Sequence, residues 1–236
     1  MMPHPTIAHR IGAILLGWLI CAQVLHAGGG EMTIRLVWQG QPVVLEKPYP
    51  TASGADTIVF SKIRCYVSDL RVYSRGQCLT ATASAPCLLD AKNGSIHPIP
   101  LEMPAETQVD EIRFTLGLDS TVNVSGAYGG DLDPTTGMYW AWQSGYINCK
   151  LEGRATAIPT QDHQFQFHLG GYRSPYLSAV PVQLAVSPGA PLVVDIPLDA
   201  FFSAVNLQAD YRIMRPGAKA HEMSQLLGAT LKSVRP

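Results

Sequence analysis

The sequence has few charged residues and lacks the short motifs that indicate nucleotide chemistry. Of its 236 residues, 15% are Asp, Glu, Lys or Arg, and the formal net charge is −1. A chain so close to neutral has no basic surface to attract nucleic acid or an anionic membrane. It also contains no Walker motif and no glycine-rich dinucleotide fingerprint. Nucleic-acid-binding and nucleotide-binding functions that depend on these features are therefore excluded.

Signatures of hydrolytic and calcium sites are missing as well. The stretch "WQSGY" lacks the leading glycine of a G-x-S-x-G nucleophile elbow and lies in a strand-rich context. Asp131 and Asp133 do not follow the calcium-loop pattern, and an ordinary turn accounts for them. The sequence offers no clustered acid–base pair for an exported hydrolase. We therefore expect that the protein is not an enzyme.

A long apolar run occurs at the N-terminus. The first ten residues contain Arg10 and no acid, and the apolar run that follows extends to Ala27. This pattern predicts a signal peptide over residues 1–27, removed by cleavage after Ala27. An uncleaved anchor and lipid attachment at Cys21 are alternatives, although the run is short for a membrane-spanning helix. We expect residues 28–236 to form a single periplasmic or secreted domain without a membrane segment.

Cysteine is scarce, and the four that remain after cleavage are Cys65, Cys78, Cys87 and Cys149. An even number in an exported chain predicts two disulfides. Of the three possible pairings we favour Cys78–Cys87, which closes a short loop, and therefore Cys65–Cys149, which joins two strand-like runs. A metal site is the alternative, but no C-x-x-C or H-x-x-x-H spacing is present.

Apolar residues alternate with other residues in several segments, and turn-forming residues separate these segments. With 18 prolines and 21 glycines, the pattern predicts an all-β fold, an antiparallel β-sandwich of Ig-like or barrel-like form. The alternating sets are Ile34/Leu36/Trp38, Ile112/Phe114/Leu116/Leu118, Phe165/Phe167/Leu169 and Leu192/Val194/Ile196/Leu198.

Helices are expected only near the C-terminus. The last segment, after "RPG", places Met223, Leu226, Leu227 and Leu231 at helical spacing, which predicts a short amphipathic helix. A helical turn is also predicted after Asp199, a suitable N-cap residue. The long polar segment 125–137 is expected to be a loop that leads into a strand at 138–150.

Histidines are the main candidates for metal ligands in the mature chain. His168 lies in a predicted strand whose core face is occupied by Phe165, Phe167 and Leu169, so its side chain points to the opposite face. His221 lies at the start of the predicted last helix, and both histidines are equally consistent with exposed, non-functional positions. His97 is expected in a loop and His163 in a turn. Two imidazoles from distant segments, joined by a methionine sulfur, would suit copper, especially Cu(I).

The stretch "GMYWAWQSGY" contains two of the four tryptophans, Trp140 and Trp142. On a strand over 138–150 both indoles would lie on one face. Packing in the core is the ordinary interpretation. The alternative is that an indole lies near the surface or near a metal, where it can be oxidised.

The chain resembles the MbnP-like family of exported copper-binding proteins, in its branch known as the metallo-mystery pair system four-Cys motif proteins. The resemblance covers roughly residues 31–236, and its most specific element is W-x-W-Q-S-G-Y. The similar segments are "GMYWAWQSGYINCKLEG" (137–153), "KIRCYVSDLRVY" (62–73), "EIRFTLGLDSTVN" (111–123), "FHLGG" (167–171) and the ending after "MRPGAKAHE".

This resemblance implies a β-sandwich that binds copper through histidines and acts with a di-haem cytochrome c peroxidase-like protein. It also implies that the partner oxidises a tryptophan near the copper to kynurenine. Trp140 and Trp142 match the family's two tryptophan positions, and His168 matches the histidine of its His–Leu–Gly strand end. His221 matches the C-terminal histidine loosely, and Met223 is added on chemical grounds.

A different class of function is compatible with the same residues. The domain could be a metal-free β-sandwich interaction module of the cell envelope. In that case the tryptophan stretch would fill the core, and the 125–137 loop would form the binding surface. A neighbouring gene for a di-haem peroxidase would favour copper handling over this alternative.

Overall fold

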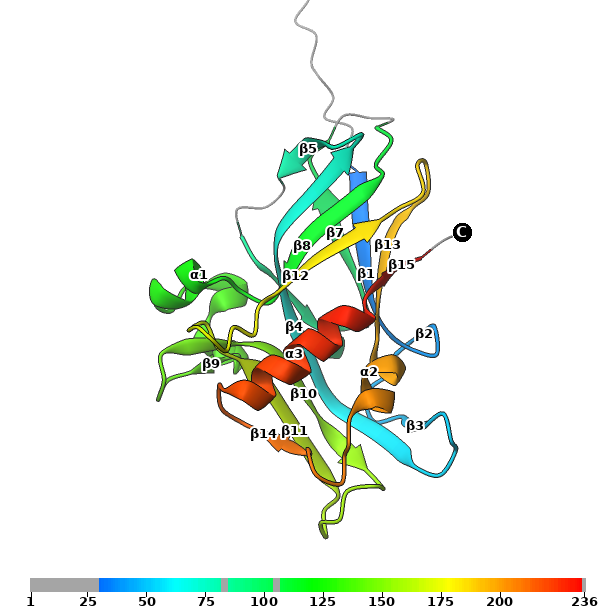
Figure 1. The fold of residues 1–236 in the computed structure, drawn as a ribbon, viewed down its shortest axis with the longest axis vertical. Coiled ribbons are helices and arrows are strands. Elements are labelled where there is room, and N and C mark those ends of the chain that lie inside the picture. The colour runs from blue at the N-terminus through cyan, green and yellow to red at the C-terminus, as the bar shows by residue number, and fades with distance from the viewer. Residues whose placement is uncertain (1–29, 82–84, 104–106, 235–236) are drawn as a thin grey trace, which may run out of the picture.

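The computed structural model describes residues 30–81, 85–103 and 107–234. The predicted signal peptide, with Cys21, lies outside the described residues. The described chain is mostly strand, with a helix near its C-terminal end, as predicted (Figure 1). None of its helices combines the length and apolar character needed to cross a membrane.

In the described residues the strands form a five-stranded and a ten-stranded sheet. The smaller sheet contains β1 (Gly30–Trp38), β2 (Gln41–Pro42), β7 (Ile96–Leu101), β13 (Leu192–Pro197) and β15 (Lys232–Ser233). The larger sheet contains β3 (Pro48–Pro50), β4 (Thr57–Ser74), β5 (Gln77–Ala81), β6 (Cys87–Asp90), β8 (Glu111–Leu116), β9 (Tyr139–Trp140), β10 (Gly145–Ala155), β11 (Gln164–Gly170), β12 (Val180–Ala185) and β14 (Arg212–Ile213).

Most strand pairs are antiparallel, as expected for a sandwich. The pairs β1–β13 and β11–β14 are parallel, because long connections bring the later strand of each pair back beside the earlier one. The alternating apolar residues predicted from the sequence point into one core shared by both sheets, except Leu118, which belongs to a second cluster. Ile34, Phe165, Phe167 and Val194 are all fully buried there.

Three helices and three 3₁₀ turns complete the described chain. They are α1 (Ser120–Val124), α2 (Leu198–Ala204), α3 (Ala218–Thr230), η1 (Ala91–Asn93), η2 (Gly130–Leu132) and η3 (Pro134–Thr136). The helix predicted at the C-terminus is α3, and it packs on β11, α2 and β12. The turn predicted after Asp199 is α2, although its N-cap residue is Pro197.

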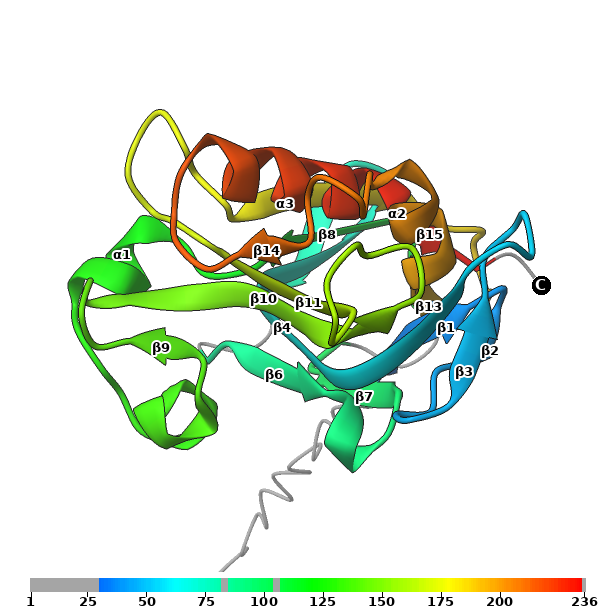
Figure 2. The same cartoon turned by 90° about the horizontal axis from the view of Figure 1, so that it is seen from below.

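Residues 118–144, which we call the outer segment, fold over the face of the larger sheet that points away from the shared core. They contain α1, η2, η3 and β9, so the predicted loop 125–137 is organised by two 3₁₀ turns. A second, smaller hydrophobic cluster lies beneath the outer segment and includes Tyr66, Met138, Trp140 and Tyr146. Figure 2 shows α3 on one side of β10 and β11 and β9 on the other.

Two local predictions are wrong. His97 lies in β7, opposite Ile34 of β1, because alternating prolines in this segment still permit an edge strand. Residues 138–150 do not form one strand, because a turn at residues 141–144 separates β9 from β10. In that turn the Gln143 amide donates to the Trp140 carbonyl (3.2 Å), and Ser144 has φ of 52°.

Candidate functional site

His168 lies on the outer face of β11, as its position in the strand predicts. Its neighbours Phe167 and Leu169 are fully buried in the shared core, so alternation turns His168 away from them. On the adjacent strand β10, Lys150 and Glu152 face the same way, and Lys150 is paired directly with His168. The result is a histidine in a row of charged side chains.

The His168 imidazole contacts a carboxylate. Its Nε2 lies 2.7 Å from Oε1 of Glu152, and Lys62 Nζ donates to Oε2 of the same carboxylate at 2.8 Å. The hydrogen bond from His168 is the largest cause that lowers the pKa of Glu152 to about 2, against the opposing effect of burial. Glu152 is therefore ionised and fixes the proton of the imidazole on Nε2.

The second ring nitrogen of His168 is available. Within the described residues Nδ1 has no hydrogen-bond partner, and it is not among the fully buried polar atoms. Histidine ligands of metals commonly donate their other N–H to a carboxylate, which sets the tautomer and the ring orientation. His168 and Glu152 have this arrangement, with Nδ1 as the nitrogen whose lone pair is free to bind a metal.

Two cations of the same face bind the main chain of the outer segment. Arg64 donates to the carbonyl of Thr136, and Lys150 donates to the carbonyl of Gly137. Arg64 also pairs with Asp90 at 2.8 Å. Lys150 is 8% exposed, and burial lowers the pKa of its ammonium group. These contacts fix the outer segment where it leads into β9.

Lys150→Met is expected to destabilise the protein by about 1–3 kcal/mol, because the Gly137 carbonyl loses its charged donor while the side-chain length is kept. Urea denaturation of the metal-free protein measures this change. Lys92→Met is the control at an exposed lysine, and it should leave the midpoint nearly unchanged. Equal midpoints for the two variants would show that Lys150 does not anchor the outer segment.

The two tryptophans occupy different environments. Trp140 in β9 is 7% exposed, whereas Trp142 in the following turn is 66% exposed. The prediction that both lie on one strand face is wrong, because the turn at 141–144 intervenes. Their rings nevertheless remain in contact, with centroids 5.8 Å apart and an interplanar angle of 52°.

Trp140 lies against the strand that carries His168. A Cβ atom added at Gly170 would be 2.6 Å from Cζ3 of Trp140. Glycine at this position therefore allows the indole to approach the backbone of β11 closely. Gly170 is two residues from His168, so both positions are on the same face of the strand. The structure thus places Trp140 and His168 on one face of the larger sheet.

The other two predicted ligands lie elsewhere. Met223 is 2% exposed and packs in the shared core, so its sulfur belongs to the apolar stripe of α3. His221 is in the first turn of α3, and its Nδ1 lies 2.5 Å from the Leu177 carbonyl oxygen. α3 packs on the core side of β11, opposite the face of His168. The structure therefore does not bring His221 or Met223 to His168.

Neither remaining histidine joins this face as a ligand. His97 is in β7 of the other sheet. His163 occupies the turn before β11 with φ of 51°, and its Nδ1 lies 2.6 Å from the Ile158 carbonyl oxygen. In the part of the chain that the structure describes, no three His, Cys, Asp or Glu side chains are grouped as a metal site.

Cys65 and Cys149 are directly opposite each other in β4 and β10, and both are buried in the shared core. Both are thiols in the structure, and burial, with a smaller contribution from the hydrogen bond to Cys65, raises the pKa of Cys149. Cys87 is also a thiol, at the start of β6, while Cys78 is exposed in β5. The register places Cys65 and Cys149 together, and the two disulfides stay predictions.

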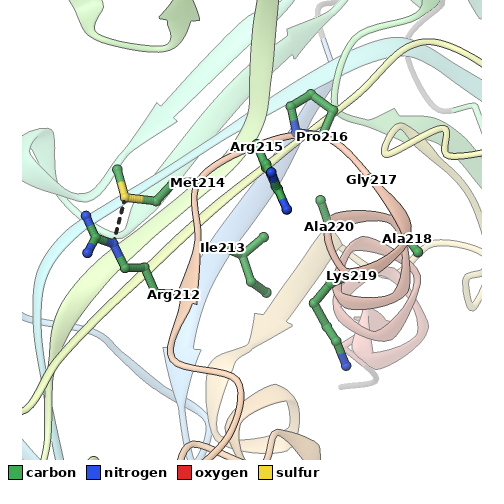
Figure 3. A pocket seen from close by; sticks show the side chains of 9 residues that line it. All are labelled: Arg212, Ile213, Met214, Arg215, Pro216, Gly217, Ala218, Lys219 and Ala220. Atoms are coloured by element: carbon green, nitrogen blue, oxygen red, sulfur yellow. Dashed lines mark hydrogen bonds between the residues drawn. The ribbon is translucent and has the colours of Figure 1, made fainter. Parts of the chain in front are cut away.

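A pocket of about 620 Å³ lies at the N-terminal end of α3. Figure 3 shows Arg212 and Met214 on one side of it and Lys219, in the first turn of α3, on the other. The Nε of Arg212 lies 3.3 Å from the Met214 sulfur, and Arg215 adds a third cation to the lining. With three cations and no histidine, this pocket is unsuited to a copper ion.

Glu152 is not among the residues predicted for the site, although the sequence carries a signal for it. Charged residues occupy alternate positions in Lys150, Glu152 and Arg154, between apolar residues of the same run. This period-two pattern predicts a charged strand face, and His168 was assigned to the same kind of face. Cross-strand pairing of the two segments could not be read from either pattern alone.

Comparison with known proteins gives two matches. The family described as MbnP matches residues 28–217. Among solved structures, MbnP from Methylosinus trichosporium superposes with a TM-score of 0.56 at 17% sequence identity, over 81% of this chain and 82% of that chain. At this identity the structural match shows a shared fold. No match was found among curated proteins. The family match includes Trp140, Trp142 and His168 and ends before His221.

Proposed function

This chain belongs to the MbnP family, and from that premise we propose that it is an exported copper-binding protein, not itself an enzyme. Its role would be to bind copper in the periplasm or outside the cell, together with a di-haem cytochrome c peroxidase-like partner. The family match begins at residue 28, directly after the predicted signal peptide, which supports export.

The observation that carries the proposal is the arrangement of His168 and Glu152. Nε2 of His168 is engaged by the carboxylate at 2.7 Å, which leaves Nδ1 as the lone-pair donor toward a metal. Imidazole nitrogen is a suitable ligand for copper. Lys62, bound to the second carboxylate oxygen at 2.8 Å, holds Glu152 in position.

The residues around His168 fit copper only in part. Met223 is excluded by burial in the core, and His221 lies across the sheet. One imidazole does not complete a copper site, so a further donor is required. Trp140 is the aromatic side chain packed on the same strand face, beside Gly170. Its oxidation to kynurenine would add an aniline nitrogen and a ketone oxygen there.

We therefore assign Trp140 as the oxidised residue. Conversion of an indole to kynurenine breaks the C2–C3 bond, leaves a ketone at C3 and releases C2 as formic acid. The balanced reaction consumes two hydrogen peroxide molecules per tryptophan and forms one water. The peroxidase partner would supply this oxidising capacity, and the chain itself supplies the positioned indole and His168.

Copper titration of protein produced together with the partner tests the ligand assignment. His168→Ala is expected to abolish Cu(I) binding in competition with a chromogenic chelator, because the anchoring imidazole is removed. Glu152→Gln should weaken binding by about 10–100-fold through loss of ring orientation. His221→Ala is the matched histidine control and should bind as the wild type does.

Two results would contradict the proposal. Wild-type affinity in His168→Ala would remove this residue from the site, and loss of binding in His221→Ala would move the site to α3. Absence of copper binding in the wild type would instead favour a metal-free interaction module. Peptide mass analysis of the same samples reports whether residue 140 has been converted to kynurenine.

A further inference from the structure

Trp140 and Trp142 form a pair that connects a buried indole to the surface. Trp140 is 7% exposed, so most of its ring is shielded from direct contact with a haem in another protein. Trp142 is 66% exposed, and its ring centroid is 5.8 Å from that of Trp140. Rings at this separation are in direct contact, in the range of attractive aromatic pairs.

We propose that Trp142 is an electron relay. An external one-electron oxidant takes an electron from Trp142, and Trp140 then reduces the oxidised Trp142 ring. In each step one electron passes from Trp140 to Trp142 and on to the oxidant, which is reduced by one electron. The Trp140 radical cation releases its indole N–H proton to water. The oxidant class is a high-valent haem or a photogenerated metal complex.

The turn between β9 and β10 keeps the pair together. The Gln143 amide donates to the Trp140 carbonyl at 3.2 Å and closes the turn that projects Trp142 outward. Gly145 pairs with Trp140 across the hairpin. A strand over 138–150 would have placed both indoles at equal depth. The turn instead gives one exposed and one buried ring without separating them.

Two of the neighbouring tyrosines, Tyr66 and Tyr146, do not offer a competing route. The ring centroids of Tyr139 and Tyr146 are 4.9 Å apart, and those of Tyr146 and Tyr66 are 6.0 Å apart. These rings therefore adjoin the hydrophobic cluster that contains Trp140. Oxidation of a tyrosine requires loss of the phenol proton. Tyr146 donates its O–H to the Leu132 carbonyl and Tyr66 to the Asp131 carbonyl, each at 2.8 Å. A peptide carbonyl is not a proton acceptor of sufficient basicity.

The protonation behaviour of these phenols agrees with their contacts. Burial is the largest cause that raises the pKa of Tyr66 to about 12, and burial also raises the pKa of Tyr146. Both phenols therefore retain their protons at neutral pH. These two buried phenols therefore do not take up the oxidising equivalent, which the indoles can carry as a radical cation before proton loss.

Flash photolysis of the purified chain tests the relay without the partner and without copper. The oxidant is tris(bipyridine)ruthenium(III), generated by a light flash with a sacrificial acceptor, and the signal is the transient absorption of the tryptophan radical. A Trp38→Phe background removes the remaining tryptophan of the mature chain, a core residue that is 4% exposed. Every tryptophan radical then belongs to the pair.

In that background Trp142→Phe is expected to slow oxidation by about tenfold or more, equivalent to a barrier increase of ~1.4 kcal/mol. Trp140→Phe should leave the rate of the first electron loss unchanged, because Trp142 remains exposed. It should also shorten the lifetime of the tryptophan radical. An unchanged oxidation rate in Trp142→Phe would overturn the relay. A dominant tyrosyl radical in the Trp38→Phe parent would overturn it as well.

The identification of Trp140 as the final target rests on the proposed function, whereas the relay does not. After reaction with a di-haem peroxidase and peroxide, the wild type should contain kynurenine at position 140, and Trp142→Phe should contain little. Kynurenine at position 140 in both proteins would overturn the relay. If only copper binding fails, the copper assignment is wrong, and the flash experiment still decides whether Trp142 relays electrons from Trp140.

Discussion

Gly153→Ala is expected to destabilise the domain by more than ~3 kcal/mol, at or beyond the upper end for overpacking of a core. A Cβ at this position would lie 2.1 Å from the Val59 carbonyl oxygen and 2.8 Å from Cζ of Phe165. Val59 is part of β4, and Phe165 is fully buried, so neither can move without displacing its neighbours. The backbone of two central strands would have to separate.

The same position affects the candidate site. The pairing of β10 with β4 shifts register between Glu152 and Gly153, so the irregularity lies next to the carboxylate that orients His168. Urea denaturation of the metal-free variant gives the change in the free energy of unfolding. Gly129→Ala is the control, because its Cβ would meet no heavy atom within 4 Å and its φ is −94°. Equal stability of the two variants would refute the steric argument.

Removing the bridge expected between Cys65 and Cys149 should cost about 2–4 kcal/mol in the oxidised protein. Directly opposite residues of antiparallel strands have Cα atoms about 4.5–5.5 Å apart, which lies within the range of roughly 4.4–6.8 Å for disulfides. The bridge would close a long stretch of chain, and closing a long loop restricts the unfolded state more than closing a short one.

Peptide mapping without reductant should recover a linked pair containing Cys65 and Cys149. The double variant Cys65→Ala/Cys149→Ala is then compared by urea denaturation with Cys78→Ala/Cys87→Ala, which opens the much shorter predicted loop. The first double variant should lose more stability than the second. Two free buried thiols in protein isolated from an oxidising compartment would contradict the predicted bridge.

The strand framework could be predicted from the sequence because its signal is local. Phe165, Phe167 and Leu169 alternate with polar residues, and alternation alone decides which side of a strand is buried. The same rule correctly predicted that the His168 side chain points away from the core. The C-terminal helix was predicted by an equally local pattern, and its buried residues include Met223 and Leu227 as the helical spacing requires.

The ligand set could not be predicted because it depends on which faces of distant segments meet. Met223 was proposed from its soft sulfur, but its helical position places that sulfur in the core. His221 was placed near His168, whereas the helix packs on the other side of the sheet. The turn after Trp140 could not be predicted, because "AWQSG" has no proline and its glycine comes only at the end. The positive φ that the turn requires is adopted by Ser144, not by a glycine.

The outer segment is attached to the sheet largely through its own main chain. Tyr66, Tyr146, Arg64 and Lys150 donate to the carbonyl oxygens of residues 131, 132, 136 and 137, respectively. A carbonyl oxygen is present whatever side chain a residue carries. These four anchors therefore depend on the identity of the strand residues and not on the side chains of the residues whose carbonyls they bind. A substitution at exposed Thr135 would therefore leave all four anchors in place.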